Sequence, residues 1–116
     1  MIREQGAEVV VVWTTFPGES DPSAFSQALV SERLAACVTT QAGLGSVYRW
    51  QDNVEAVTEY QLTIKTTADR VAELERRVGE LHPYEVPEFL VLPVSGGSVT
   101  YLEWIGASTR VDRGPA

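Results

Sequence analysis

The order in which hydrophobic patterns follow one another is the feature that most constrains the fold of this chain. It opens with an apolar, β-branched run (EVVVVWTTF) without alternation, which predicts a central strand covered on both faces. A helical pattern, two strand-like runs, a second helical pattern, another apolar run and a short helical pattern follow. The expected strands are 8–16, 35–50 with a break near Gly43 and Gly45, 54–65 and 88–94, and the expected helices are about 22–34, 67–81 and 100–108.

This order predicts an α+β fold, the ferredoxin-like βαββαβ sandwich, in which two helices cover one face of a four-stranded antiparallel sheet. A short C-terminal helix follows the last strand. With 116 residues the chain has room for one core, so we expect residues 1–116 to form a single domain. The ordered part is expected to span about 8–109, and the tails 1–7 and 110–116 are expected to be flexible.

The second and third strands are expected to form a long hairpin. Along the third strand Leu62 and Ile64 point to one face, and Glu59 and Gln61 point to the other. The intervening QDN sequence (51–53) is typical of a turn, because Asp and Asn tolerate the left-handed backbone conformation. Both strands are long for so small a sheet, which indicates that another subunit covers the hairpin.

Composition excludes several classes of function. The net charge of −7 and the lack of a basic stripe argue against nucleic-acid binding, which requires clustered Lys and Arg. The longest apolar run, VVVVW, is too short for a membrane span or a signal-peptide core, so no membrane association and a cytoplasmic location are expected. The single cysteine, Cys37, excludes an internal disulfide and fits a reducing compartment.

The only histidine, His82, lies in a stiff frame between Pro83 and Pro87 (ELHPYEVPEF). Proline fixes its own φ and keeps the preceding residue out of the helical region, so this segment should end a helix and lead into a strand. In an extended segment His82 and Tyr84 face one way and Glu85 the other. His82 therefore has two interpretations, a structural imidazole near a helix C-terminus or a metal ligand.

Two further residues also have alternative roles. Cys37 is expected on an inner strand, where a free cysteine is either a small core residue or, with a base beside it, a nucleophile. Lys65 ends the third strand, where it can hold an anion, pair with Glu59 or Glu88, or remain a solvated lysine. Aromatic residues, which often mark interfaces, occur at Tyr48, Trp50, Tyr84 and Trp104 and can pack between subunits or stack on a ligand.

Five stretches of the chain together resemble a known family, the CutA-type divalent-cation tolerance proteins. The resemblance covers about 9–108 and implies a ferredoxin-like homotrimer in which long hairpins pair between subunits. It also implies a role in the response to metal ions, with copper binding in some members, whereas the biochemical activity of the family is poorly defined. The matching stretches are ERLAACVTT (32–40), SVYRWQ (46–51), IKTT (64–67), LHPYEVPE (81–88) and YLEWI (101–105).

The chain departs from the family pattern at three places. Trp13 stands where some members have a cysteine, and Leu81 stands where some have a second histidine. Both changes remove ligands that suit copper and zinc, which puts copper binding there in doubt. Asp52 stands where glycine is common in the hairpin turn, which should alter the turn and leave the fold unchanged.

We therefore expect a non-enzymatic, trimeric metal-response protein with a pocket between subunits and no obligatory cofactor. The expected ligand is Cu(II), another divalent metal or a small anion. Two alternatives are a signalling or scaffold trimer that binds partner proteins, and an acylphosphatase-like enzyme. The loop TTFPGESDP does not fit the last, since it carries two acids and no arginine where an anion cradle is needed. The expected pocket residues are Cys37, Lys65, Tyr84, Glu88 and Trp104, with His82 as the metal ligand.

Overall fold

The computed structural model describes residues 8–111, so the predicted tails 1–7 and 112–116 lie outside the described residues. The remaining two residues of the second tail, 110 and 111, follow the last helix without regular structure. The elements, in chain order, are β1 (Val9–Pro17), α1 (Ser23–Ser31), β2 (Cys37–Trp50), β3 (Asn53–Thr67), the 3-10 turn η2 (Ala68–Arg70), α2 (Val71–Leu81), β4 (Leu90–Pro93) and α3 (Val99–Thr109).

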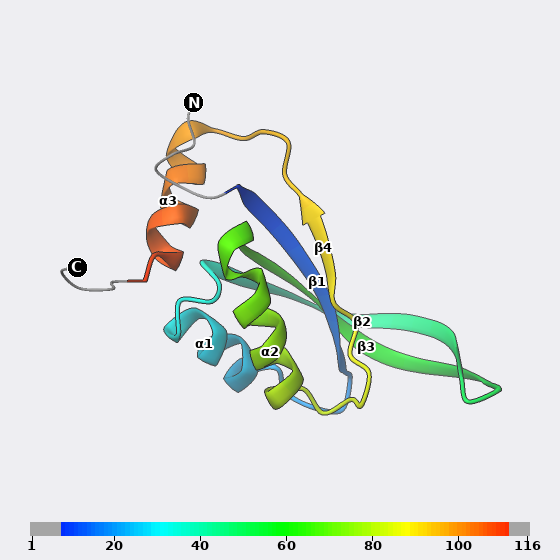
Figure 1. Cartoon of the computed structure of the whole chain (residues 1–116). Helices are drawn as coiled ribbons and strands as arrows, with labels where there is room; N and C mark the ends of the chain where they lie inside the picture. Colours follow the sequence, from blue (N-terminus) through cyan, green and yellow to red (C-terminus); the bar gives the residue numbers. More distant parts are fainter. Residues whose placement is uncertain (1–7, 112–116) are drawn as a thin grey trace.

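The four strands form one antiparallel sheet in the order β2-β3-β1-β4, which confirms the predicted ferredoxin-like α+β fold (Figure 1). β1 pairs with β3 along its whole length, with Val12 opposite Ile64. The last strand is shorter than predicted, because β4 begins at Leu90 instead of residue 88. The segment that follows the second proline of the ELHPYEVPEF frame therefore belongs to a loop, not to the sheet.

Helices α1 and α2 cover one face of the sheet, which we call the helix face (Figure 1). The core lies between them. Val12 of β1, Leu62 and Ile64 of β3, Leu29 of α1 and Leu74 of α2 are each 0% exposed. Full burial of an aliphatic side chain of this size stabilises a fold by roughly 1.5–3 kcal/mol, so this layer is the main source of stability.

The opposite face of the sheet, which we call the open face, is not covered by α1 or α2, and α3 contacts it beside Lys65. The prediction that β1 is covered on both faces is therefore wrong for the single chain: Val10 and Val12 are buried, whereas Trp13, the residue after Val12, is 39% exposed. Trp13 lies opposite Leu90 of β4, which is 53% exposed. The continuous apolar run was interpreted correctly as a strand, but Trp13 on its open face stays partly exposed in the described chain.

Helix α1 is shorter than predicted at both ends. It begins at Ser23, where Asp21 accepts hydrogen bonds from the backbone N and the Oγ of Ser23. It ends at Ser31, three residues before the predicted end at Leu34. The chain turns there because Arg33 adopts a left-handed conformation (φ 62°), and the amide of Leu34 donates to the carbonyl of Leu29 at 2.9 Å. This is a Schellman motif with arginine in place of the usual glycine.

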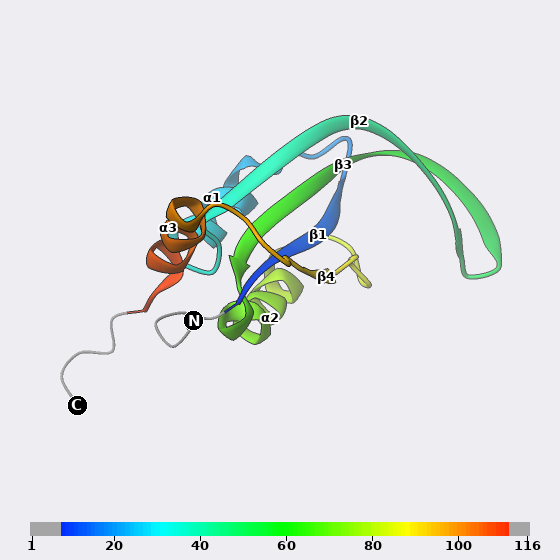
Figure 2. The same cartoon turned by 90° about the horizontal axis from the view of Figure 1, so that it is seen from above.

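Strands β2 and β3 form a long ribbon that projects well beyond the two helices (Figure 2). The predicted break in β2 is absent, and a bulge between Gln41 and Leu44 carries the strand past Gly43, whose φ is +75°. The turn at the tip comprises Gln51 and Asp52, both with positive φ, which is the two-residue type I′ geometry. Asn53, predicted to be in the turn, is instead the first residue of β3.

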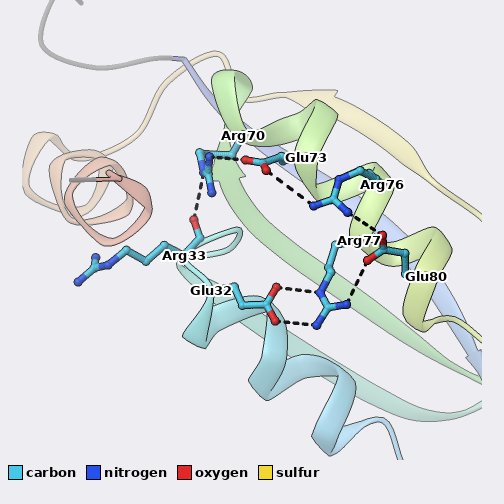
Figure 3. Close-up of polar contacts among 7 residues, drawn as sticks. All are labelled: Glu32, Arg33, Arg70, Glu73, Arg76, Arg77 and Glu80. Carbon is cyan, nitrogen blue, oxygen red and sulfur yellow. Dashed lines mark hydrogen bonds and ion pairs between the residues drawn. The ribbon is translucent and has the colours of Figure 1, made fainter. Parts of the chain in front are cut away.

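A charged network on the outer surface ties α1 to α2 (Figure 3). The guanidinium of Arg77 donates to both carboxylate oxygens of Glu32, each at 2.8 Å, which is the two-bond geometry that arginine favours with carboxylates. This pairing keeps the pKa of Glu32 below its usual value. Further pairs along α2 link Arg70 to Glu73, Arg76 to Glu73 and Glu80, and Arg77 to Glu80.

Candidate functional site

A groove of about 900 Å³ lies between the ribbon and the loop that connects α2 to β4. Thr15 of β1 and two residues of β3, Glu59 and Gln61, form its floor. Strand β2 contributes residues 46–50 and the loop contributes residues 83–88. The groove therefore includes Tyr84 and Glu88 of the predicted site, together with most of the stiff proline frame.

Glu59 is the most deeply buried acid of the groove, at 5% exposed. The alternation along β3 predicted correctly that Glu59 lies on the face opposite Leu62 and Ile64, but it gave no sign that Glu59 is buried. The loop after α2 brings Tyr84 over the strand, and the Tyr84 hydroxyl donates to Glu59 Oε2 at 2.7 Å. Burial and the carboxylate of Glu59 raise the pKa of Tyr84, so the phenol stays protonated and keeps donating.

Gln61, two residues further along the same face of β3, connects the floor of the groove to its rim. Its Nε2 donates to the backbone carbonyl of Thr14 at 3.2 Å and to Glu88 Oε2 at 3.5 Å. A neutral amide thus anchors the Glu88 carboxylate at the end of the proline frame. Glu59 and Glu88 are both held by uncharged donors.

His82 follows the last residue of α2 and is 7% exposed. Its Nε2 lies 2.6 Å from the carbonyl of Thr15, and its Nδ1 lies 3.0 Å from the amide nitrogen of Tyr84. A carbonyl can only accept and an amide N–H can only donate, so Nε2 carries the proton and the imidazole is neutral. Burial lowers the pKa of His82, which agrees with a neutral ring.

The ring of His82 also links the two faces of the sheet. It packs against the core residues Phe16 and Phe25, with ring centroids 5.1 and 5.8 Å away, and against Tyr84 at 5.0 Å. The shared orientation of His82 and Tyr84 was predicted. Because Tyr84 in turn holds Glu59, the imidazole fixes the loop that forms one wall of the groove. His82 as a metal ligand stays a prediction, and a metal at Nδ1 would have to displace the Tyr84 N–H.

The remaining predicted residues gather at the other end of β3. Lys65 Nζ donates to the hydroxyl of Tyr101 at 3.2 Å, which raises the pKa of Lys65. Tyr101 packs on Trp104 with ring centroids 5.5 Å apart, and Cys37 lies opposite Lys65 in the sheet. Within the described chain Lys65 does not pair with Glu59 or Glu88, which was one of the alternatives open from the sequence. Cys37 is also not on an inner strand, because β2 is an edge strand, and it is only partly buried.

The single chain therefore divides the predicted site residues into two groups on the open face. Tyr84 and Glu88 lie in the groove, with His82 behind them, whereas Cys37, Lys65 and Trp104 lie near α3. Lys65 lies six positions along β3 from Glu59, a separation of about 20 Å along a strand. One copy of the chain does not bring the two groups together.

Glu59 and Gln61 are the groove residues that sequence reasoning missed as a site. Their positions in an alternating strand are those of solvent-facing side chains, and nothing local distinguishes them. The one sequence signal for a site here is the polar pair itself, an acid and an amide two residues apart in the middle of the third strand. Their burial depends on Tyr84, which is 25 residues away in sequence.

The loop after β1 was weighed as an anion cradle and has its amides engaged elsewhere. Gly18 N donates to the Thr58 carbonyl at 3.0 Å, and Ser20 N donates to the Pro17 carbonyl at 3.1 Å. A Cβ on Gly18 would lie 2.6 Å from the Thr58 carbonyl oxygen, so the glycine is needed for this close approach. The loop connects β1 to α1 and is hydrogen-bonded to β3.

The topology, the projecting ribbon and the groove at its base define a ferredoxin-like protein with a site on its open face. Comparison with known proteins gives a family. The family model for the CutA1 divalent ion tolerance protein matches residues 10–108. The divalent-cation tolerance protein CutA of Thermus thermophilus is 46% identical over 85% of this chain and 96% of its own length. This chain belongs to the CutA family of divalent-cation tolerance proteins.

Two further relatives agree with this assignment. The crystal structure of CutA1 from Oryza sativa superposes with a TM-score of 0.86 at 38% identity, covering 90% of this chain and 96% of that one. The chloroplastic protein CutA of Arabidopsis thaliana is 41% identical over 87% of this chain, which spans 56% of that longer protein. No helix within residues 8–111 is both long and apolar enough to cross a bilayer.

Proposed function

We propose that this protein acts in divalent-cation tolerance as a homotrimer, with a divalent cation or another small ligand bound in a pocket where two copies meet. The family supports the role in cation tolerance. The observation that carries the assembly is the uncovered open face, where Trp13 and Leu90 form an exposed cross-strand pair. Exposed apolar surface of this kind is typical of a protein–protein interface.

The ribbon supports the same assembly. Val47 and Val54 near its tip are 72% and 67% exposed, and β2 is an edge strand with unpaired backbone groups. Long, exposed, apolar edge strands are usually paired or covered in stable proteins. A neighbouring copy that pairs with the ribbon would satisfy the backbone and bury these side chains.

The described residues alone do not fit a copper centre. Within 8–111 no three His, Cys, Asp or Glu side chains are close enough together to hold a metal ion. The groove offers carboxylate and carbonyl oxygens, which suit Mg²⁺, Ca²⁺ or Mn²⁺ better than copper. A divalent cation bound here would therefore take Glu88 from one copy and further ligands from a second copy.

Light scattering combined with calorimetric titration tests this proposal. The purified, metal-free protein should scatter as three chains and take up a divalent cation to saturation, and Glu88→Gln should weaken that uptake. The matched control is Glu75→Gln, which removes an exposed acid of α2 outside the groove. A particle of one chain at micromolar concentration, or uptake equal in both variants, would refute the proposal.

The alternative of a signalling or scaffold trimer is distinguished by the same experiment. In that case the protein would still scatter as three chains but show no saturable uptake of Cu²⁺, Zn²⁺, Mg²⁺ or Mn²⁺. A cytoplasmic location, also expected, is tested by fractionation of the native cell, since one relative is named chloroplastic.

A further inference from the structure

We propose that the groove receives a positively charged nitrogen group, an ammonium or guanidinium, which pairs with Glu59. This inference rests on the proposed function, and it names the chemical class of the small ligand proposed there. It differs from the small anion expected from sequence.

The carboxylate of Glu59 carries the argument. A buried carboxylate is costly unless a counter-charge or a metal accompanies it, because burial removes its hydration. Glu59 is 5% exposed, yet within residues 8–111 no Lys, Arg or His side chain forms an ion pair with it. Oε2 receives the Tyr84 hydroxyl, whereas Oε1 has no hydrogen-bond donor in the described part of the chain. This unpartnered oxygen belongs to a residue that lines the groove.

The other charges of the groove favour a cation. Glu85 and Glu88 line it together with Glu59, and Arg49 is the one basic residue among the lining residues. The donor that reaches Glu88 is the neutral amide of Gln61. An anion entering the groove would meet three carboxylates against one guanidinium, so its binding is opposed by electrostatic repulsion.

The size and walls of the groove favour an organic cation over a bare metal ion. Its volume of about 900 Å³ is within the range of pockets that hold small organic molecules. Tyr48, Trp50 and Tyr84 line it, and aromatic faces attract ammonium and guanidinium groups. A bare metal ion would require three or more converging ligands, which the described residues of one copy do not provide, so a metal needs ligands from a second copy whereas an organic cation does not.

Two acids of the groove favour a ligand with two cationic ends. Glu59 and Gln61 line the groove from alternate residues of β3, and Gln61 holds the Glu88 carboxylate. A short diamine could place one ammonium at Glu59 and the other at Glu88. Putrescine (1,4-diaminobutane) is therefore the probe of choice, and 1,4-butanediol and succinate are its neutral and anionic counterparts of equal chain length.

The experiment titrates the full-length protein with these three compounds while the amide resonances of residues 59–61, 84–86 and 88 are followed by NMR. Putrescine should shift these resonances to saturation, and the diol and succinate should bind at least about tenfold more weakly, the factor expected for loss of a charge-assisted contact. If wild-type protein bound putrescine no more tightly than succinate or the diol, the proposal would be overturned without the need for any variant.

Two variants locate the contact. Glu59→Gln keeps the size of the side chain and an acceptor for Tyr84 but removes the charge, so it should weaken putrescine binding by about tenfold or more. Glu75→Gln on α2 removes an exposed acid elsewhere and should leave the affinity unchanged. An unchanged affinity in Glu59→Gln, with the fold verified by circular dichroism, would refute the role of Glu59.

The same nitrogen chemistry can come from a Lys or Arg side chain of a second copy. In that case wild-type protein would not bind putrescine until diluted to dissociation, and Glu59→Gln would lower the mass seen by light scattering. If neither putrescine binding nor mass depends on Glu59, the inference fails. The proposed function fails on different results, a one-chain particle or cation uptake indifferent to Glu88.

Discussion

The two halves of strand β3 have similar alternating sequences and opposite environments. In the half near the helices, Leu62 and Ile64 are fully buried under α1 and α2. In the half near the tip, Val54 is 67% exposed, and it lies opposite Arg49 of β2. The difference teaches that the periodic pattern specifies a strand and its two faces, while burial depends on what other elements reach that part of the strand.

The groove lies where these two environments meet. Glu59 is the first deeply buried residue of β3 when the strand is followed from the tip toward the core. No residue of β3 from Asn53 to Thr58 is buried, whereas Leu62 and Ile64 beyond Glu59 belong to the core. A site at this boundary has a rigid floor formed by the sheet. One of its walls is the ribbon, which is exposed in the single chain.

The largest effect on stability is expected from a substitution in the buried half of β3. Leu62→Ala removes a fully buried side chain and leaves a cavity, so the free energy of unfolding should fall by about 2–5 kcal/mol. Urea denaturation measures this loss. The matched control, Val54→Ala in the exposed half, should change the stability of dissociated chains by less than about 0.5 kcal/mol. Equal losses would show that the two halves are equally covered in solution.

The next largest effect on stability is expected beside Glu59, where the buried and exposed halves of β3 meet. Tyr84→Phe removes the donor to the buried Glu59 carboxylate, and leaving a buried acceptor unsatisfied costs about 1–3 kcal/mol. Thermal unfolding at one fixed concentration measures this loss. Tyr101→Phe is the control, because it removes a hydroxyl that contacts Lys65 at a more exposed position. A smaller effect at residue 84 than at residue 101 would contradict the importance of the Tyr84–Glu59 contact.

A pH effect follows from His82. Its pKa is lowered in the folded protein by burial, so the unfolded chain binds a proton at a higher pH than the folded chain does. Stability from this group is therefore fully present above about pH 6.5, the ordinary histidine pKa, and is lost as the pH falls from there toward the lower folded value. Urea midpoints at pH 7.5, 6.5 and 5.5 measure it. The decline should be smaller in His82→Gln, and an unchanged profile would exclude His82 as its source.

The smallest effect concerns the outer surface. Glu32→Gln disrupts the two-bond pairing with Arg77, and because both side chains are partly exposed the free energy of unfolding should fall less than in any of the variants above. The loss should shrink further in 1 M NaCl, where exposed charges are screened. A loss that is larger, or insensitive to salt, would show that this pair is as important as the buried half of β3.

The elements themselves could be predicted from the sequence because they depend on local patterns. The strand–helix order, the antiparallel hairpin and the end of α2 before Pro83 all follow from periodicity and from the backbone limits of proline. The end of α1 was less accessible, since arginine at a left-handed position gives no signal. The predicted turn, 51–53, was one residue too long, because Asn53 begins β3. Left-handed backbone was expected at Asp52 and Asn53 and occurs at Gln51 and Asp52.

The candidate site was predicted only in part. The proline frame led to His82, Tyr84 and Glu88, because prolines and a single histidine can be recognised directly in the sequence. Glu59 was missed because its burial arises when a distant loop folds over the strand. The assignment of Cys37 to an inner strand failed because sheet order is not encoded in the pattern of one strand.

The 20 Å or so between Glu59 and Lys65 has a consequence for stoichiometry. If both groups belong to one pocket, the Lys65 end of one copy must meet the Glu59 end of the next, which is a head-to-tail contact. A ring closed by such contacts contains as many pockets as copies, and no pocket lies on the rotation axis. Each chain would then serve two neighbouring pockets at once, so a ligand in one pocket would contact the same β3 strand that forms part of the next.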